Sequence, residues 1–274
     1  MILSACGLFE EDELYPHYIH MNDYHIVVED QQGTADQNLS DSWVYYGGDL
    51  LGAFELGADV PILNNKENNQ LLIFPGIREN GIRALPSLHF MLRPDTFDLQ
   101  WEALKIDTLV PTFRYFDDVN FRLIENFEFG NTFNQNLDGN PSTRLVRSSE
   151  DSFEGSYSGK MEVFEGSEVL EAASDFIYLD LPNGRPVYLE MNYKNNHPFS
   201  VGLVGERPEA AETKFYKITF NESEDWNKVV INFQDEISLG GFTGYRILFG
   251  MSLDRDHPVD TATVFLDNLK LVHR

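Results

Sequence analysis

Short alternating runs of apolar and polar residues fill the chain, and no segment longer than about ten residues shows the 3.6-residue period of an amphipathic helix. The last run, residues 262–272, shows the alternation most clearly. It places one set of aliphatic side chains on a common face that we expect to be buried: Val264, Leu266, Leu269 and Leu271. Asp267 and Asn268 interrupt this run at its centre. Because an unpaired buried carboxylate is costly, Asp267 needs a cation, a basic side chain or several backbone donors.

The first 115 residues predict a small β-sandwich. Apolar runs bounded by turn residues indicate strands at residues 24–29, 42–46, 50–56, 70–75, 88–92 and 96–104. Gly47 and Gly48 separate two of these runs and predict a hairpin, while Pro75 and Gly76 are expected to end the strand at 70–75. The number and spacing of the strands are typical of an antiparallel, immunoglobulin-like sandwich.

A second β-domain follows a short linker. Further strands are indicated at residues 187–191, 199–204, 214–220, 226–233 and 245–251, and residues 170–176 are the one stretch that we interpret as a helical turn. We therefore predict an all-β protein in four segments: a tether at 1–16, an immunoglobulin-like β-sandwich at 17–115, a linker at 116–121 and a second β-domain at 122–274.

The charge of the chain narrows its possible partners. Acidic residues outnumber basic ones by 45 to 20, so the formal net charge is −25. A field of this sign repels nucleic acid and anionic lipid surfaces, and we expect no nucleic-acid partner. It suits a secreted or surface protein and the binding of divalent cations. No segment approaches the roughly 20 apolar residues that a membrane-spanning helix needs.

The single cysteine stands in a stretch that resembles a targeting signal. Residues 3–7, Leu-Ser-Ala-Cys-Gly, resemble a bacterial lipobox, in which the cysteine is diacylated. The acidic run at residues 10–13 resembles the export signal of Bacteroidota surface lipoproteins. This resemblance implies lipidation of Cys6, attachment to the outer membrane through the lipid anchor, and exposure to the cell exterior. The alternative is an ordinary free cysteine followed by a solvated acidic tether.

Four motifs in the second domain point to one fold. Residues 126–130, the Gly-Ser loop at 155–158, residues 226–229 and residues 265–269 occur in the order seen in galactose-binding-like jelly rolls. The domain at 122–274 thereby resembles carbohydrate-binding modules of the family 4, 9 and 22 type. The resemblance implies that the immunoglobulin-like β-sandwich is followed by a C-terminal jelly-roll β-sandwich.

The same resemblance implies a structural calcium ion, Ca2+. In that family a calcium ion commonly ties the first strand, the Gly-Ser loop and the last strand together. Glu128 and Asp267 would supply side-chain oxygens, with Glu150 or Asp151 as a further ligand and backbone carbonyls of the loop completing the set of about six to eight oxygens. The alternative interpretation leaves Glu128 solvated and lets Asp267 accept backbone hydrogen bonds.

A glycan site would need aromatic faces on which sugar rings stack. The second domain offers five such side chains: Tyr188, Tyr193, Tyr216, Trp226 and Tyr245. Aromatic residues on strands more often belong to a core, and we interpret Trp226 in particular as buried. The sequence alone therefore does not choose a ligand-binding residue.

We read the chain as non-catalytic. The seven histidines form no helical metal pair and none lies in a nucleophile-elbow motif, and no glycine-rich phosphate loop occurs. Acidic pairs are too numerous to identify a hydrolase, which stays open as an alternative. The main prediction is a surface-exposed outer-membrane lipoprotein that acts through protein contacts, as accessory subunit of an outer-membrane assembly, secretion or uptake complex. The alternative is a glycan-binding lipoprotein.

Overall fold

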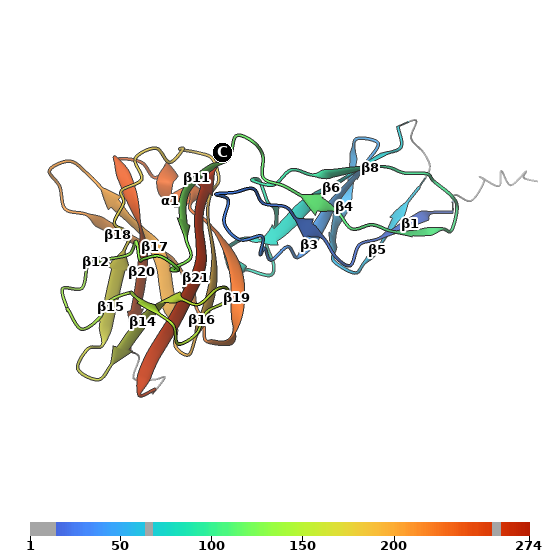
Figure 1. Cartoon of the computed structure of the whole chain (residues 1–274). Helices are drawn as coiled ribbons and strands as arrows, with labels where there is room; N and C mark the ends of the chain where they lie inside the picture. Colours follow the sequence, from blue (N-terminus) through green and yellow to red (C-terminus); the bar gives the residue numbers. More distant parts are fainter. Residues whose placement is uncertain (1–14, 64–67, 254–258) are drawn as a thin grey trace, which may run out of the picture.

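The computed structural model describes residues 15–63, 68–253 and 259–274. It shows two β-domains joined side by side, the N-terminal domain at the right and the C-terminal domain at the left of Figure 1. The predicted all-β class is confirmed. Cys6 and the acidic run at 10–13 lie outside the described residues. Within the described ranges, no helix has the length and apolar character needed to cross a membrane.

The N-terminal domain packs one large sheet against smaller ones. Its described strands are β1 (His17–His20), β2 (His25–Ile26), β3 (Asp41–Tyr46), β4 (Asp49–Glu55), β5 (Asp59–Ile62), β6 (Gln70–Arg78), β7 (Pro86–Leu88), β8 (Asp95–Asp98), β9 (Ile106–Thr108) and β10 (Thr112–Phe113). The large sheet has the order β4-β3-β6-β7, with β8 also on β6, and the smaller sheets are β5-β1-β9 and β10-β2. Aliphatic side chains of β1 and β5 meet those of β3 and β6 in a common core.

The predicted hairpin is present, but the neighbouring strand β6 is longer than predicted. Gly47 (φ 56°) and Gly48 (φ 92°) connect β3 to β4, as expected for a turn that requires positive φ. The expected end of a strand at Pro75 is wrong, because β6 continues to Arg78. Pro75 lies between the segment of β6 that pairs with β8 and the segment that pairs with β7. The 3₁₀ helix η1 (Glu79–Gly81) follows.

The C-terminal domain is a jelly roll of two sheets, which confirms the predicted fold. Its strands are β11 (Asn120–Glu125), β12 (Gln135–Asn136), β13 (Val146–Ser148), β14 (Ser158–Phe164), β15 (Val169–Ala173), β16 (Val187–Asn195), β17 (Phe199–Glu206), β18 (Thr213–Phe220), β19 (Ser223–Asn232), β20 (Gly244–Ser252) and β21 (Thr261–His273). Sheet 1 has the order β13-β14-β21-β16-β19, with β11 also on β21, and sheet 2 has the order β12-β15-β20-β17-β18. The helix α1 (Gln234–Ser238) connects β19 to β20.

The closing strand β21 lies at the centre of sheet 1 (Figure 1). Along one side it pairs first with β14 and then with β11, and along its other side it pairs with β16. The four aliphatic side chains predicted for its inner face are all fully buried in the core: Val264, Leu266, Leu269 and Leu271. Asn268 has φ 50°, and the register with β16 shifts there, so a bulge moves the inward-facing positions by one residue.

Two predicted elements are wrong. The strand expected at 88–92 is absent beyond Leu88, where β7 ends, and residues 90–91 form a turn. Residues 170–176 do not form a helical turn, because residues 169–173 are strand β15, which pairs with β20 over five positions. Leu170 and Ala172 point into the core, and Glu171 between them points to the opposite face of sheet 2. The alternation of a strand therefore prevails here over the helical propensity of Leu, Glu and Ala.

The two domains share a core at their junction. β11 begins at Asn120, inside the expected linker. Tyr188, Val230 and Val272 of sheet 1 belong to the core of the N-terminal domain. The outer face of sheet 1 is therefore covered by the N-terminal domain over part of its area and open over the rest.

Candidate functional site

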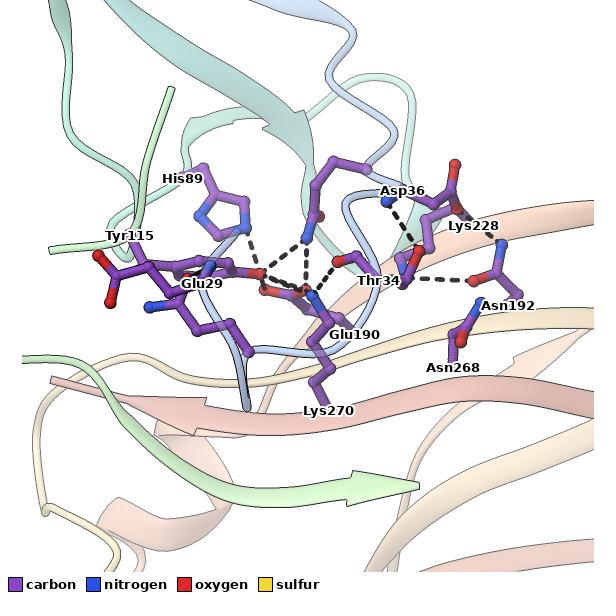
Figure 2. Close-up of polar contacts among 12 residues, drawn as sticks. Glu29, Thr34, Asp36, His89, Tyr115, Glu190, Asn192, Lys228, Asn268 and Lys270 are labelled. Carbon is purple, nitrogen blue, oxygen red and sulfur yellow. Dashed lines mark hydrogen bonds and ion pairs between the residues drawn. The ribbon is translucent and has the colours of Figure 1, made fainter. Parts of the chain in front are cut away.

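The most strongly charged buried cluster lies at the domain junction (Figure 2). The Glu190 carboxylate is fully buried and accepts hydrogen bonds from the Tyr115 hydroxyl (2.9 Å) and the Gln37 amide (2.6 Å). Nε2 of His89 lies 3.3 Å from it, and Nζ of Lys270 lies 3.9 Å away. Burial alone would raise the pKa of Glu190, but His89 and the charge of Lys270 hold this pKa well below its usual range. We call these five residues the domain joint.

Polar contacts continue from the domain joint along the outer face of sheet 1 (Figure 2). The Lys228 ammonium donates to Oδ1 of Asn192 (3.2 Å), and the Asn192 amide donates to Asp36 (2.8 Å). Burial lowers the pKa of Lys228 to about 8, against the opposing effect of the Glu190 charge. Since the N-terminal domain covers these groups, we interpret them as fixing the orientation of the two domains rather than as a ligand site.

The predicted calcium ligand Glu128 instead accepts backbone hydrogen bonds. Its Oε1 accepts the N–H groups of Ser156 (2.7 Å) and Tyr157 (2.9 Å). These donors lower the pKa of Glu128. Gly155 (φ 72°) brings the loop close enough that a Cβ atom there would overlap the Glu128 carboxylate. Glu128 is therefore neither simply solvated nor directed at a metal.

Asp267 behaves in the same way from the other side of the loop. Its Oδ2 accepts the N–H groups of Phe153 (3.0 Å) and Glu154 (3.1 Å), and its Oδ1 accepts that of Asn268 (2.8 Å). Burial raises the pKa of Asp267 to about 6, although the backbone donors act in the opposite direction. The alternative interpretation from the sequence, that Asp267 accepts backbone hydrogen bonds, agrees with this geometry.

The donor set does not fit calcium as it stands. Glu150, the third predicted ligand, pairs with Lys160 at 2.6 Å. Among the described residues, no three acidic, histidine or cysteine side chains come together as a group that could hold a metal ion. Oε1 of Glu128 and both oxygens of Asp267 already accept N–H groups, with which a calcium ion at these atoms would have to compete. Calcium binding stays a prediction.

A second gathering of polar groups lies on the open outer face of sheet 2. Tyr216 of β18 is 46% exposed, and its hydroxyl-bearing end packs against Gly250 of the sheet: a Cβ atom on Gly250 would clash with the hydroxyl oxygen and come within 2.8 Å of the ring atom Cε1. The Tyr216 hydroxyl donates to Oε1 of Glu171 (2.7 Å), and Lys214 pairs with the other oxygen of this carboxylate. Burial, together with the Glu171 carboxylate, raises the pKa of Tyr216, so the hydroxyl stays a donor.

The strand register explains why Tyr216 faces outward. Gly202 of β17 lies opposite Tyr216, while Val201 lies opposite Ile218, so Lys217 is an extra residue in β18. This bulge lets Tyr216 and Thr219 share the outer face of sheet 2 although they are three residues apart.

Tyr216 forms one wall of a groove of about 350 Å³. Its polar lining includes Glu171, Ser200, Thr219 and Ser252, and the hydroxyl oxygens of Ser200 and Thr219 lie 2.7 Å apart. A second hollow of about 690 Å³, beside Asp138 and Asn140, shares Val169 and Glu171 with the groove. The two therefore meet at Glu171 and form an extended surface depression. We call the first the Tyr216 groove.

The five aromatic candidates from the sequence differ in burial. Tyr188 and Tyr245 are buried in the cores, and Tyr193 packs against the core of the jelly roll. Tyr216 is the exposed one. The interpretation of Trp226 as buried is wrong, because its side chain lies partly exposed on the outer face of sheet 1. No motif in the sequence identifies Glu171, and the composition of residues 170–176 predicts a helical turn there.

Comparisons with known proteins give a consistent class of neighbours at low similarity. No protein-family model matches the chain, and no curated protein matches it. The xylan-binding CBM22-1 domain of Paenibacillus barcinonensis Xyn10C is 15% identical at a TM-score of 0.39, over 56% of this chain and 93% of that one. The family 30 carbohydrate-binding module of Clostridium thermocellum Cel9D-Cel44B is 17% identical at 0.37, over 55% and 89%. A variant of a family 29 module is 19% identical at 0.35, over 57% and 91%.

The main functional prediction from the sequence is corrected by these findings. It described an accessory subunit of an outer-membrane complex acting through protein contacts, whereas the solved structures that resemble the chain are carbohydrate-binding modules. Since likenesses at this level do not assign a ligand, the case for a glycan depends on the geometry of the Tyr216 groove.

Proposed function

We propose that the C-terminal domain binds a glycan in the Tyr216 groove, without a catalytic step. The observation that supports this most is the ring of Tyr216, which is 46% exposed on sheet 2, packs closely against Gly250 and has its hydroxyl fixed by Glu171. A sugar ring has an apolar face that packs on an aromatic ring and hydroxyl groups at its edge. Ligand sites combine such an apolar surface with a few well-placed polar groups, and this groove offers both.

The charges of the groove favour a neutral sugar. The Glu171 carboxylate is neutralised by Lys214, and the other polar side chains of the lining are the hydroxyl groups of Ser200, Thr219 and Ser252 and the buried imidazole of His197. Hydroxyl groups both donate and accept hydrogen bonds, as the hydroxyls of a sugar do. The continuity of the groove with the hollow beside Asp138 provides room for several linked sugar units.

Replacement of Tyr216 tests the proposal. Isothermal titration with neutral oligosaccharides (xylohexaose, cellohexaose and mannohexaose) should show binding to the wild type that Tyr216→Ala weakens by roughly tenfold or more. Tyr216→Phe keeps the ring and should retain most of the affinity. Phe129→Ala, which removes a fully exposed ring elsewhere, serves as the control. Unchanged affinity in Tyr216→Ala, or no binding of any of the sugars by folded protein, would count against the proposal.

We also propose that this glycan-binding chain is a surface lipoprotein of the outer membrane, anchored through Cys6. The lipobox-like stretch at 3–7 and the acidic run at 10–13 support this. Metabolic labelling with an alkyne-tagged fatty acid tests the anchor: the wild type should be labelled and should pellet with membranes, whereas Cys6→Ser should be unlabelled. Protease added to intact cells should then degrade the anchored protein if it faces outward. Labelling of Cys6→Ser, or protection from protease, would refute the respective part.

A further inference from the structure

The open half of sheet 1 carries a second group of aromatic rings. Trp226 of β19 lies 6.0 Å from Phe153 and 6.5 Å from Phe265 of β21 between ring centroids. Phe153 is 39% exposed, and the other two rings are partly exposed. Among the described residues these rings belong to none of the hydrophobic cores. We call these three residues the Trp226 patch. Packing in a hydrophobic core does not explain why these rings lie together.

Two lysines, each paired with a carboxylate, lie beside the rings. Phe265 lies between Lys160 of β14 and Lys194 of β16 in the strand register. The Lys160 ammonium lies 5.9 Å from the centre of the Phe265 ring and pairs with Glu162 at 2.7 Å. Lys194 pairs with Asp151 at 2.8 Å. Lys160 also pairs with Glu150 at 2.6 Å, so each lysine beside the patch has at least one carboxylate partner.

Asp151 also fixes the indole ring. Nε1 of Trp226 donates to Oδ1 of Asp151 at 3.1 Å, while the other oxygen of this carboxylate accepts from Lys194. Partial burial would raise the pKa of Asp151, but these two donors lower it overall, so the carboxylate stays ionised and the contacts persist. The orientation of the Trp226 ring is thus set before any ligand arrives.

A hollow of about 230 Å³ adjoins the patch. Its lining includes Lys194, Asn196, Ser223, Glu224, Thr263 and Phe265. The N-terminal domain covers Tyr188 and Val230 farther along the same face, and does not reach this end. The hollow lies on the sheet opposite to the Tyr216 groove, so the two surfaces are separate.

We propose that the Trp226 patch is a second carbohydrate-binding site, which takes a neutral sugar residue on the opposite sheet from the Tyr216 groove. The Lys160 ammonium already lies beside the Phe265 ring, to which a cationic ligand would otherwise be attracted. The carboxylates paired with the two flanking lysines disfavour an anionic one. What remains is a small, neutral ligand with an apolar face and polar edges, and the hollow accommodates only a short segment of such a ligand. This site stands whether or not the Tyr216 groove binds.

The indole N–H resonance of Trp226 provides a direct test. Nuclear magnetic resonance spectra are recorded while xylohexaose, cellohexaose or mannohexaose is titrated into the wild type and into Tyr216→Ala. We expect the Trp226 resonance to shift in both proteins with at least one of the sugars. The Trp101 resonance, whose N–H donates to the carbonyl of Ile62, should not move and serves as the internal control.

Two variants make the result decisive. Phe265→Ala and Phe153→Ala should each weaken the binding that is followed at Trp226 by roughly tenfold. Phe153 lies outside the strands, so its replacement tests the patch even if Phe265→Ala perturbs sheet 1. A Trp226 resonance that stays still while Tyr216→Ala abolishes all binding would overturn the second site and leave the proposed function intact. Binding that persists in Tyr216→Ala but is lost in Phe153→Ala would overturn the proposed glycan binding in the Tyr216 groove and support the second site.

Discussion

Glu128 and Asp267 hold the same loop from two sides. Oε1 of Glu128 accepts the N–H groups of Ser156 and Tyr157, and Oδ2 of Asp267 accepts those of Phe153 and Glu154. Asp267 belongs to the closing strand, and Glu128 follows the first strand of the jelly roll. The backbone of the loop therefore connects the two ends of the domain, in the place where the sequence resemblance implied a calcium ion.

Replacing Asp267 by Ala should destabilise the protein equally with and without calcium. The change leaves N–H groups of the loop without an acceptor, which costs about 1–3 kcal/mol of unfolding free energy for such groups. Chemical denaturation in millimolar calcium and in chelator measures the two losses. Glu165→Ala removes an exposed carboxylate from a turn and serves as the control. It should leave the unfolding free energy unchanged both in calcium and in chelator. A loss confined to the calcium sample would instead show that calcium is bound, with Glu128, Asp267 and Glu150 as its predicted ligands.

The raised pKa of Asp267 predicts a pH dependence of known sign. Its ordinary value is 3.8, and burial raises it to about 6 in the folded protein. Between these two values the folded state binds more protons than the unfolded state, so the contribution of this group to stability falls as pH rises from about 4 to about 6. Denaturation of the wild type and Asp267→Asn across this range should show the wild type losing about 2 kcal/mol relative to the variant. If the unfolding free energies of the wild type and Asp267→Asn change in parallel over this pH range, the pKa of Asp267 is not raised.

The domain joint should be sensitive to loss of its carboxylate. Glu190→Ala leaves Lys270 buried without its anionic partner, and breaking a buried pair in this way costs about 3–5 kcal/mol. Tyr115→Phe removes one hydroxyl donor from the same carboxylate and should cost only about 1 kcal/mol. The double variant should cost less than the sum, because both changes act on one contact network. Additive losses would mean that Tyr115 and Glu190 are not coupled.

The sequence predicted what depends on local alternation. The inner face of β21 and the Gly47–Gly48 hairpin follow from residue order alone, and both are present. The domain joint does not, since Gln37 and Glu190 are 153 residues apart and neither belongs to a recognisable motif. Asp267 could be recognised as a carboxylate in need of partners. Its actual partners, backbone N–H groups of a loop, leave no trace in the side-chain sequence.

The Tyr216 groove was missed for a different reason. Its formation depends on the extra residue Lys217, which changes the face that Tyr216 occupies, and on Glu171, whose strand has the composition of a helix. The sequence predicts Trp226 as a core residue because most strand aromatics are buried. Whether such a ring faces in or out is decided by strand register, and bulges shift that register by one residue.

Gly250 offers the sharpest test of how the Tyr216 ring is positioned. A Cβ atom at this position would come within 2.8 Å of the ring atom Cε1, so Gly250→Ala has to displace the ring. Because the ring is half exposed, we expect the unfolding free energy to change by less than about 1 kcal/mol. Glycan affinity should fall by roughly tenfold, as in Tyr216→Ala.

The double variant separates ring displacement from other effects of the added methyl group. If Gly250→Ala acts only through Tyr216, adding it to Tyr216→Ala should weaken glycan binding no further, because the ring is already absent. Gly130→Ala is the matched control, since a Cβ atom there meets no neighbour within 4 Å and its φ is not in the left-handed region. Additive losses of affinity, measured by the same titration, would show that Gly250 contacts the ligand itself and that the orientation of the ring is not what the groove depends on.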